Sequence, residues 1–107
     1  MVVRLIGRVD LYILHMYSWV VHYEADPEKA TTNLVKHGVA FDEAASCLLD
    51  PMALVIEDDA PGEERWVLVG TSERGRVLTV VYTMRGDVPR MISARKATAR
   101  EKVSYED

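Results

Sequence analysis

The chain has 107 residues and one cysteine, Cys47, so it can form a single domain with a core but no intramolecular disulfide. Hydrophobic residues make up 49% and charged residues 28%, the balance of a globular protein, and no apolar run reaches the roughly 20 residues of a membrane span. The net charge of −4 disfavours indiscriminate binding to nucleic acid. We expect a cytoplasmic protein without a cofactor. We also expect no metal site, because Cys47 and the three histidines lack ligand-like spacing.

The charges are distributed unevenly along the chain. Between Glu57 and Glu64 there are five acids and no base, whereas between Arg76 and Lys102 there are seven bases and two acids. The second segment can supply basic side chains to an anionic ligand. A solvated surface is the alternative interpretation of both segments.

The first predicted strand covers Trp19 to Glu24, a segment rich in β-forming residues. The residues before it have a basic start and a short apolar stretch, but no small-residue cleavage site follows. We therefore do not expect a signal peptide.

A helix is predicted over residues 27–37. Asp26 is a suitable N-cap, and Pro27 fits the first helical position because its missing N–H is not needed there. Gly38 suits a left-handed C-terminal cap.

The faces of this helix follow from a rotation of about 100° per residue. One stripe gathers polar and basic side chains, namely Lys29, Asn33 and Lys36, with His37 at its edge. Ala30 and Leu34 lie further round the helix and are expected to be buried.

A second helix is predicted from Asp42 to Leu49, where Asp50-Pro51 ends it. A strand from Ala53 to Glu57 and an acidic turn follow. Short links then separate three further strands, which favours an antiparallel meander, and a last helix closes the chain. These last elements cover Arg65–Thr71, Val77–Met84, Pro89–Arg95 and Ala97–Tyr105.

The predicted fold class is α+β, a small antiparallel sheet with helices on one face, in the order β-α-α-β-β-β-β-α. Strand alternation assigns side chains to the two faces. Core positions are expected to include Leu78, Val80, Tyr82, Met84, Ile92 and Ala94. Arg85 and Arg95 are expected to project from the opposite, less apolar face, together with Met91 and Ser93.

The chain resembles the BrnT family, toxins of bacterial BrnT–BrnA toxin–antitoxin pairs. The matching segments are DPEKATTNLVKHGVAFDEA, LDPMALVIEDD, EERWVLVG, VVYTMRGD and RMISARKATAREKVSYE. They run from about Tyr23 to the C-terminus in matching order and spacing, which is more specific than any single short motif.

The resemblance implies a RelE-like fold and RNA cleavage that arrests growth. It also implies a BrnA-like ribbon-helix-helix antitoxin as partner, with operator DNA contacted only through that antitoxin. The toxin domain then covers residues 22–107, and residues 1–21 form an N-terminal extension, for which Met16 is an alternative start. The family commonly has tryptophan where this chain has Ala25, so one aromatic contact to RNA is absent.

Metal-independent RNA cleavage needs an activated ribose 2′-hydroxyl, stabilisation of the charged phosphate and a proton for the leaving oxygen. With the resemblance, Arg85 and Arg95 are the candidates for phosphate stabilisation, helped by Arg90, because guanidinium pairs with two phosphate oxygens and stays charged. Alternatively they are surface arginines that pair with Glu57 or Asp58.

His37 is a candidate general acid or base, because imidazole exchanges protons near neutral pH. Alternatively it only stabilises the last turn of its helix. Tyr105 is the rival acid, or a ring packed across the last helix. Lys29, Asn33 and Lys36 are expected to hold RNA phosphates, unless they form an ordinary solvated face.

A second class of function stays open at this stage. The chain could be a non-catalytic interaction module whose basic surface binds an antitoxin-like partner and co-represses transcription.

Overall fold

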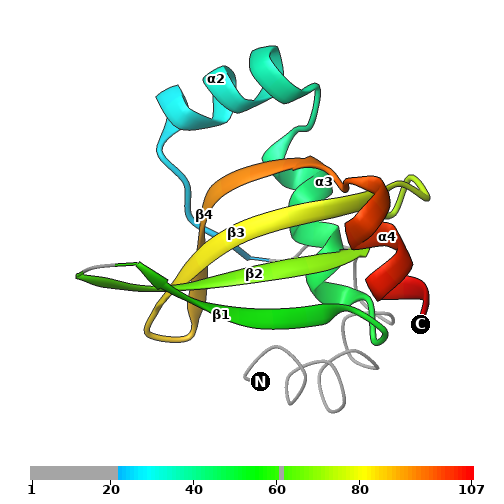
Figure 1. The fold of residues 1–107 in the computed structure, drawn as a ribbon. Coiled ribbons are helices and arrows are strands. Elements are labelled where there is room, and N and C mark those ends of the chain that lie inside the picture. Colours follow the sequence, from blue (N-terminus) through cyan, green and yellow to red (C-terminus); the bar gives the residue numbers. More distant parts are fainter. Residues whose placement is uncertain (1–21, 61) are drawn as a thin grey trace, which may run out of the picture.

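A computed structural model describes residues 22–60 and 62–107. Within these ranges the chain forms helices α2, α3 and α4, a short 3₁₀ helix η1 and strands β1 to β4 (Figure 1). In chain order they are α2 Pro27–His37, α3 Phe41–Ser46, η1 Cys47–Leu49, β1 Leu54–Ala60, β2 Glu63–Thr71, β3 Val77–Arg85, β4 Val88–Lys96 and α4 Ala99–Glu106.

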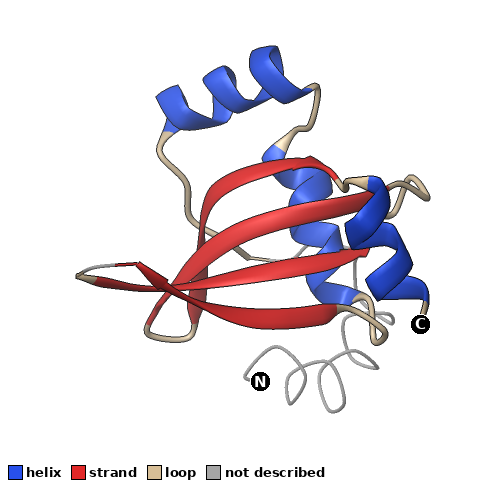
Figure 2. Ribbon diagram, in the orientation of Figure 1, coloured by secondary structure: helices blue, strands red, loops and turns tan. Residues whose placement is uncertain are grey.

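The four strands form one antiparallel sheet in the order β1-β2-β3-β4, which confirms the predicted meander and the α+β class (Figure 2). Helix α3 lies behind the sheet, α2 stands beside β4, and α4 lies in front. Half of the predicted first strand, residues 19–21, lies outside the described residues. Within them, Glu24 forms an isolated parallel bridge with Arg90. The expectations for residues 1–21, including a start at Met16, fall outside the described part.

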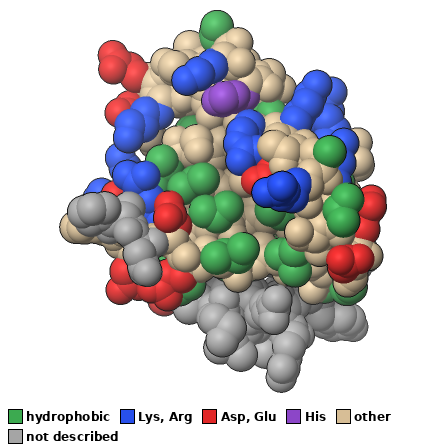
Figure 3. Space-filling view, in the orientation of Figure 1, with side chains coloured by type: hydrophobic (Ala, Val, Ile, Leu, Met, Phe, Trp, Pro, Cys, Tyr) green, Lys and Arg blue, Asp and Glu red, His purple; other side chains and the backbone are tan. Residues whose placement is uncertain are grey.

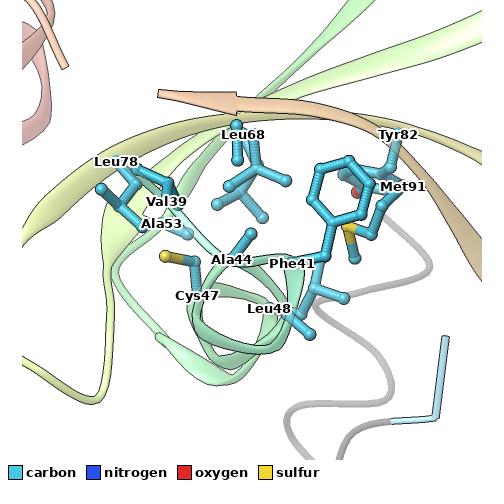
Figure 4. Packing of buried hydrophobic residues seen from close by; sticks show 13 residues of the cluster. Val39, Phe41, Ala44, Cys47, Leu48, Ala53, Leu68, Leu78, Tyr82 and Met91 are labelled. Atoms are coloured by element: carbon cyan, nitrogen blue, oxygen red, sulfur yellow. The ribbon is translucent and has the colours of Figure 1, made fainter. Parts of the chain in front are cut away.

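The hydrophobic core lies between α3 and one face of the sheet (Figure 4). The predicted alternation of β3 is confirmed, since Leu78, Val80 and Tyr82 are all buried. Cys47 is also fully buried as expected, and burial raises the pKa of its thiol to about 12. The helical side of the core consists of Phe41, Ala44, Ala45, Cys47 and Leu48.

A buried carboxylate joins α3 to the turn between β2 and β3. Glu43 is buried and accepts hydrogen bonds from the Ser72 hydroxyl at 2.7 Å and from the Arg76 guanidinium. The hydrogen bonds from Arg76 hold the pKa of Glu43 below its usual value despite its burial.

Both ends of α2 are capped as the sequence predicts. The Asp26 carboxylate accepts from the Glu28 N–H at 2.9 Å, and Gly38, at φ 70°, donates its N–H to the Leu34 carbonyl at 2.8 Å. The positive φ is the conformation for which glycine is favoured at this position.

The expected burial of α2 is wrong at two positions. Asn33, predicted to be an exposed RNA contact, is buried, whereas Leu34 is 50% exposed. The Asn33 amide donates to the carbonyls of Ala94 at 2.8 Å and Val39 at 2.9 Å, and its oxygen accepts from the Ala94 N–H at 3.0 Å. Helix α2 therefore meets the polar edge of β4 rather than an apolar face.

A β-bulge in β4 corrects the predicted faces of that strand. Val81 pairs with Ser93 but Tyr82 pairs with Met91, so Ile92 is the extra residue. As a result Met91 is buried in the core, whereas Ile92, predicted to be a core residue, is only half-buried. Ala94 is buried as predicted.

Helix α4 lies on the face of the sheet opposite α3, so the helices do not share one face. Its Glu101 carboxylate accepts from the Thr79 hydroxyl at 2.9 Å, and Thr79 alternates with the core residues of β3. We call this side the open face, because α4 covers only one end of it (Figure 1). In the described part of the chain, no helix is long and apolar enough to cross a membrane.

Replacing Asn33 by aspartate is expected to lower the free energy of unfolding by about 2–3 kcal/mol, because the carboxylate loses both donors and faces two carbonyl oxygens. Urea unfolding measures the change. The control is Thr32→Ala at an exposed neighbouring position, which should change stability by less than about 0.5 kcal/mol. Equal stability of the two variants would show that the amide does not hold α2 in place.

Candidate functional site

A cleft of about 260 Å³ lies where the start of α2 meets one end of the sheet. It is open toward solvent at the end of the sheet away from α4. Its lining is mostly charged and comes from α2 and three strands, with Asp26, Lys29, Glu63, Arg65, Arg85, Arg90, Met91 and Ile92. We call this the cationic cleft.

Four bases and two acids line the cationic cleft, so positive charge is in excess. Arg90 also lies 3.5 Å from the Glu24 carboxylate, and the Arg65 Nε lies 3.6 Å from the Glu63 carboxylate. That Arg65 nitrogen is buried, and it has no hydrogen-bond partner among the described residues. An anion with several acceptor oxygens would relieve the repulsion between the bases.

Local features of the backbone bring these bases together. The capped start of α2 places Lys29 over the end of the sheet, and the bulge at Ile92 shifts the alternation of β4, which turns Arg90 to the same face as its partner Thr83. Arg85 alternates with the core residues of β3 and also lies on this face. Figure 3 shows the open face, on which basic side chains gather over α2 and the adjoining end of the sheet, around an apolar surface.

Arg95 lies on the open face, as the alternation predicts, but outside the cationic cleft. It pairs with Thr79, six residues before Arg85 on β3, which separates the two positions by about 20 Å along the strand. Its guanidinium donates two hydrogen bonds to Glu101, at 2.8 and 2.9 Å. The predicted pair of arginines at one phosphate is therefore not formed in this structure.

His37 and Lys36 lie in the last turn of α2, which follows Asn33, the residue that binds Ala94 next to Arg95. Eight residues separate Lys29 from His37, about 12 Å along the helix axis. His37 is half-buried, and neither residue lines the cationic cleft. Of the predicted RNA contacts, the cleft thus contains Lys29 and Arg90, but not Lys36 or Asn33.

Tyr105 anchors α4 to the sheet. Its hydroxyl donates to the Asp50 carboxylate at 2.5 Å and lies 2.9 Å from the Thr71 hydroxyl. Burial, together with the hydrogen bond to Asp50, raises the pKa of Tyr105. The phenol proton is thus engaged in a hydrogen bond to Asp50. This favours the alternative given above for Tyr105, a structural role in packing the last helix, over a role as the acid.

Three charged residues of the cationic cleft were not among the sequence candidates. Asp26 was recognised only as a helix cap, and Glu63 and Arg65 only as part of an acidic segment and the strand after it. The available signal was the alternation of β2, in which Arg65 has the opposite parity to the buried Leu68. In the described part of the chain, no three His, Cys, Asp or Glu residues are grouped as metal ligands.

The ion pair that holds Arg95 is expected to depend on pH. Hydrogen bonds from Arg95 lower the pKa of Glu101 to about 2, below the value of about 4.3 for an unfolded glutamate. Wild type should therefore exceed Glu101→Gln in stability by about 2 kcal/mol above pH 5, and this advantage should disappear as the pH falls through about 4 toward 2. Urea unfolding at a series of pH values, with Glu106→Gln as the exposed control, measures it. A difference that stays constant with pH would contradict the assignment.

The comparisons with known proteins agree with this fold. The family model described as "Ribonuclease toxin, BrnT, of type II toxin-antitoxin system" matches residues 26–101. The crystal structure of the Brucella abortus ribonuclease toxin BrnT is similar, with a TM-score of 0.59 and 24% identity over 74% of this chain and 99% of that one. No curated protein matches the chain. Because the family model covers most of the chain, including α2, α3 and all four strands, the protein belongs to the BrnT family of ribonuclease toxins from type II toxin–antitoxin systems.

Proposed function

We propose that this protein is a metal-independent, RelE-like ribonuclease toxin that cleaves RNA at the cationic cleft and thereby arrests growth. The observation that carries the proposal is the grouping of Lys29, Arg65, Arg85 and Arg90 around one opening on the open face. Phosphate is the anion that such a group of guanidinium donors is suited to bind. Membership of a ribonuclease family supports RNA as the molecule that supplies this phosphate.

In the proposed reaction the ribose 2′-oxygen attacks the adjacent phosphorus, and the bond from phosphorus to the 5′-oxygen breaks. The products are a 2′,3′-cyclic phosphate and a 5′-hydroxyl end. Arg85 and Arg90 stabilise the extra negative charge of the five-coordinate phosphate, while Lys29 holds the backbone in place. Arg95 lies about 20 Å away along the sheet, so it contacts a phosphate several nucleotides further along the RNA, once that phosphate has displaced Glu101 from it.

A base must accept the 2′-hydroxyl proton, and an acid must protonate the 5′-oxygen. We propose Glu63 as the base, because it lines the cleft and is exposed, whereas the Asp26 carboxylate is already engaged in capping α2. His37 stays a proposed acid, and because it lies outside the cleft, it must move to within hydrogen-bond distance of the leaving oxygen when RNA binds. Tyr105 is a weaker candidate, since its proton is held by Asp50.

As a type II toxin the protein has an antitoxin partner. We propose that this partner is a BrnA-like ribbon-helix-helix protein and that operator DNA is bound only through it. The exposed Leu34 and Val35 on α2 favour a second candidate function, a non-catalytic module that binds the antitoxin and co-represses transcription. A wild-type chain that binds the antitoxin but does not cleave RNA would support that alternative.

Arg85→Ala and Arg90→Ala should each lower kcat/KM for RNA cleavage by about 100-fold, because each removes a donor to the charged phosphate. The matched control is Arg100→Ala, an exposed arginine on α4 outside the cleft, which should cleave at the wild-type rate. Thermal unfolding of all three variants checks that the fold is intact. If folded Arg85→Ala and Arg90→Ala cleave like wild type, the cleft is not the catalytic site.

Purified protein should cleave RNA in EDTA at the same rate as in magnesium, since the proposed reaction uses only side chains of the chain. End-group analysis should find 2′,3′-cyclic phosphate and 5′-hydroxyl ends. An RNA with 2′-deoxyribose at the cleaved position should resist cleavage, because its nucleophile is missing. Cleavage that requires added magnesium, or that leaves 5′-phosphate ends, is incompatible with this mechanism.

A further inference from the structure

The two edges of the sheet are treated differently. At β4, the Glu24 N–H donates to the Pro89 carbonyl at 2.9 Å, and the Met91 N–H donates to the Glu24 carbonyl at 2.8 Å. Further along the same edge, the Asn33 amide pairs with both backbone groups of Ala94. The main chain of Glu24 and the side chain of Asn33 thus cover the edge of β4. Proteins commonly cover a sheet edge in this way to prevent another strand from pairing with it.

Strand β1 forms the opposite edge. All seven of its residues pair with β2 in one unbroken register, from Leu54 opposite Val69 to Ala60 opposite Glu63. Among the described residues, no strand and no side-chain amide pairs with the outer side of β1. The edge is therefore regular and long enough to accept another strand.

The side chains of β1 divide into two halves. Leu54 and Val55 are half-buried and Ile56 is 63% exposed, whereas the next residues, Glu57 and Asp58, are exposed acids. Ile56 continues an apolar row across the open face, because it lies opposite Val67, which in turn lies opposite Val81. An added strand would thus meet apolar neighbours along one half and negative charge along the other.

These charges decide which strand fits. Antiparallel pairing of two copies along the whole of β1 would place Glu57 opposite Glu57 and Asp58 opposite Ile56. Like charges and a charge beside an apolar side chain are both destabilising between neighbouring strands. A strand with lysine or arginine at the matching positions gains attraction at the same place. The edge of β1 therefore disfavours a second copy of this chain and favours a basic partner.

We propose that β1 accepts an extended segment of the antitoxin as a fifth strand, with an apolar run beside Leu54–Ile56 and a basic run beside Glu57 and Asp58. The identity of the occupant rests on the proposed function; the pattern of the segment rests on β1 itself. Backbone hydrogen bonds supply affinity, and the boundary between apolar and acidic residues sets the register.

This placement separates antitoxin anchoring from the RNA site. Strands β2 and β3 lie between β1 and β4, so the added strand would lie about 15–20 Å from the strand that carries Arg90. The bound segment therefore leaves the Arg85 and Arg90 side of the cationic cleft open, although it lies only two strand spacings, about 10 Å, from Glu63 and Arg65 on β2. A peptide that binds β1 and a non-cleavable RNA should bind at the same time.

Hydrogen exchange of the full chain tests the proposal directly. The probes are two synthetic peptides that join a Val-Ile-Val run to a Lys-Arg-Lys run, one in each chain direction, and matched peptides with Glu-Asp-Glu in place of the bases. One basic peptide at about 1 mM should slow exchange in β1 by about tenfold, and the acidic peptides should not. The double variant Glu57→Lys/Asp58→Lys should reverse this preference, whereas Glu73→Lys, an acid in the β2–β3 turn, should leave it unchanged.

Three outcomes would overturn the proposal. Protection of other elements alone would show that the peptide binds elsewhere. Equal protection of β1 by basic and acidic peptides would show that the charges do not select the partner. Absence of any protection would show that β1 does not bind such a strand. Protection of β1 that rises with protein concentration and needs no peptide would instead identify a second copy. The experiment contains no RNA, so its result is independent of whether the protein cleaves RNA.

Discussion

The hydrogen bonds between Asn33 and Ala94 hold helix α2 against the edge of β4. Helix α2 lies beside the sheet rather than on one of its faces, so it meets unpaired N–H and C=O groups of β4 instead of apolar side chains. A primary amide can satisfy both groups at once, as a neighbouring strand would. The same bonds close this edge of the sheet and hold Lys29 beside Arg90.

The bulge at Ile92 is the second feature that shapes the cleft. In a regular strand Arg90 would share a face with Ala94 and point toward the core, where a charge would be costly. The extra residue returns Met91 to the core and Arg90 to the open face beside Arg85. Bulges often redirect side chains in this way next to functional sites. Two local deviations from ideal structure, one at an edge and one within a strand, thus assemble the basic group.

Sequence reasoning was most reliable where the determinants are local. The caps at Asp26 and Gly38 gave the bounds of α2 correctly, and the alternation in β3 identified Leu78, Val80 and Tyr82 as core residues. These signals depend only on neighbouring residues and on the period of the element. The family resemblance was confirmed over residues 26–101.

The errors arose where the tertiary environment departs from the usual one. Helix periodicity assumes an apolar neighbour, so it assigned burial to Leu34, whereas the polar edge of β4 selected Asn33. A prediction from alternation assumes that the strand has no bulge, so it assigned Met91 and Ile92 to the wrong faces of the sheet. The hydrogen bond from Arg95 to Glu101 joins β4 to α4 on a face that was expected to be uncovered. The periodicity of a single strand contains no information about a partner on another element.

The proposed RNA site lies where Lys29, Arg85 and Arg90 meet. The most direct test is an NMR titration of the full chain with a short RNA whose 2′-hydroxyls are methylated, so that it binds without being cleaved. RNA bound at this site should cause saturable shifts of the Arg85 and Arg90 side-chain signals and of the signals from the first turn of α2. Saturable shifts confined to the outer surface of α4 or to the β1–β2 hairpin, with these signals unchanged, would contradict it.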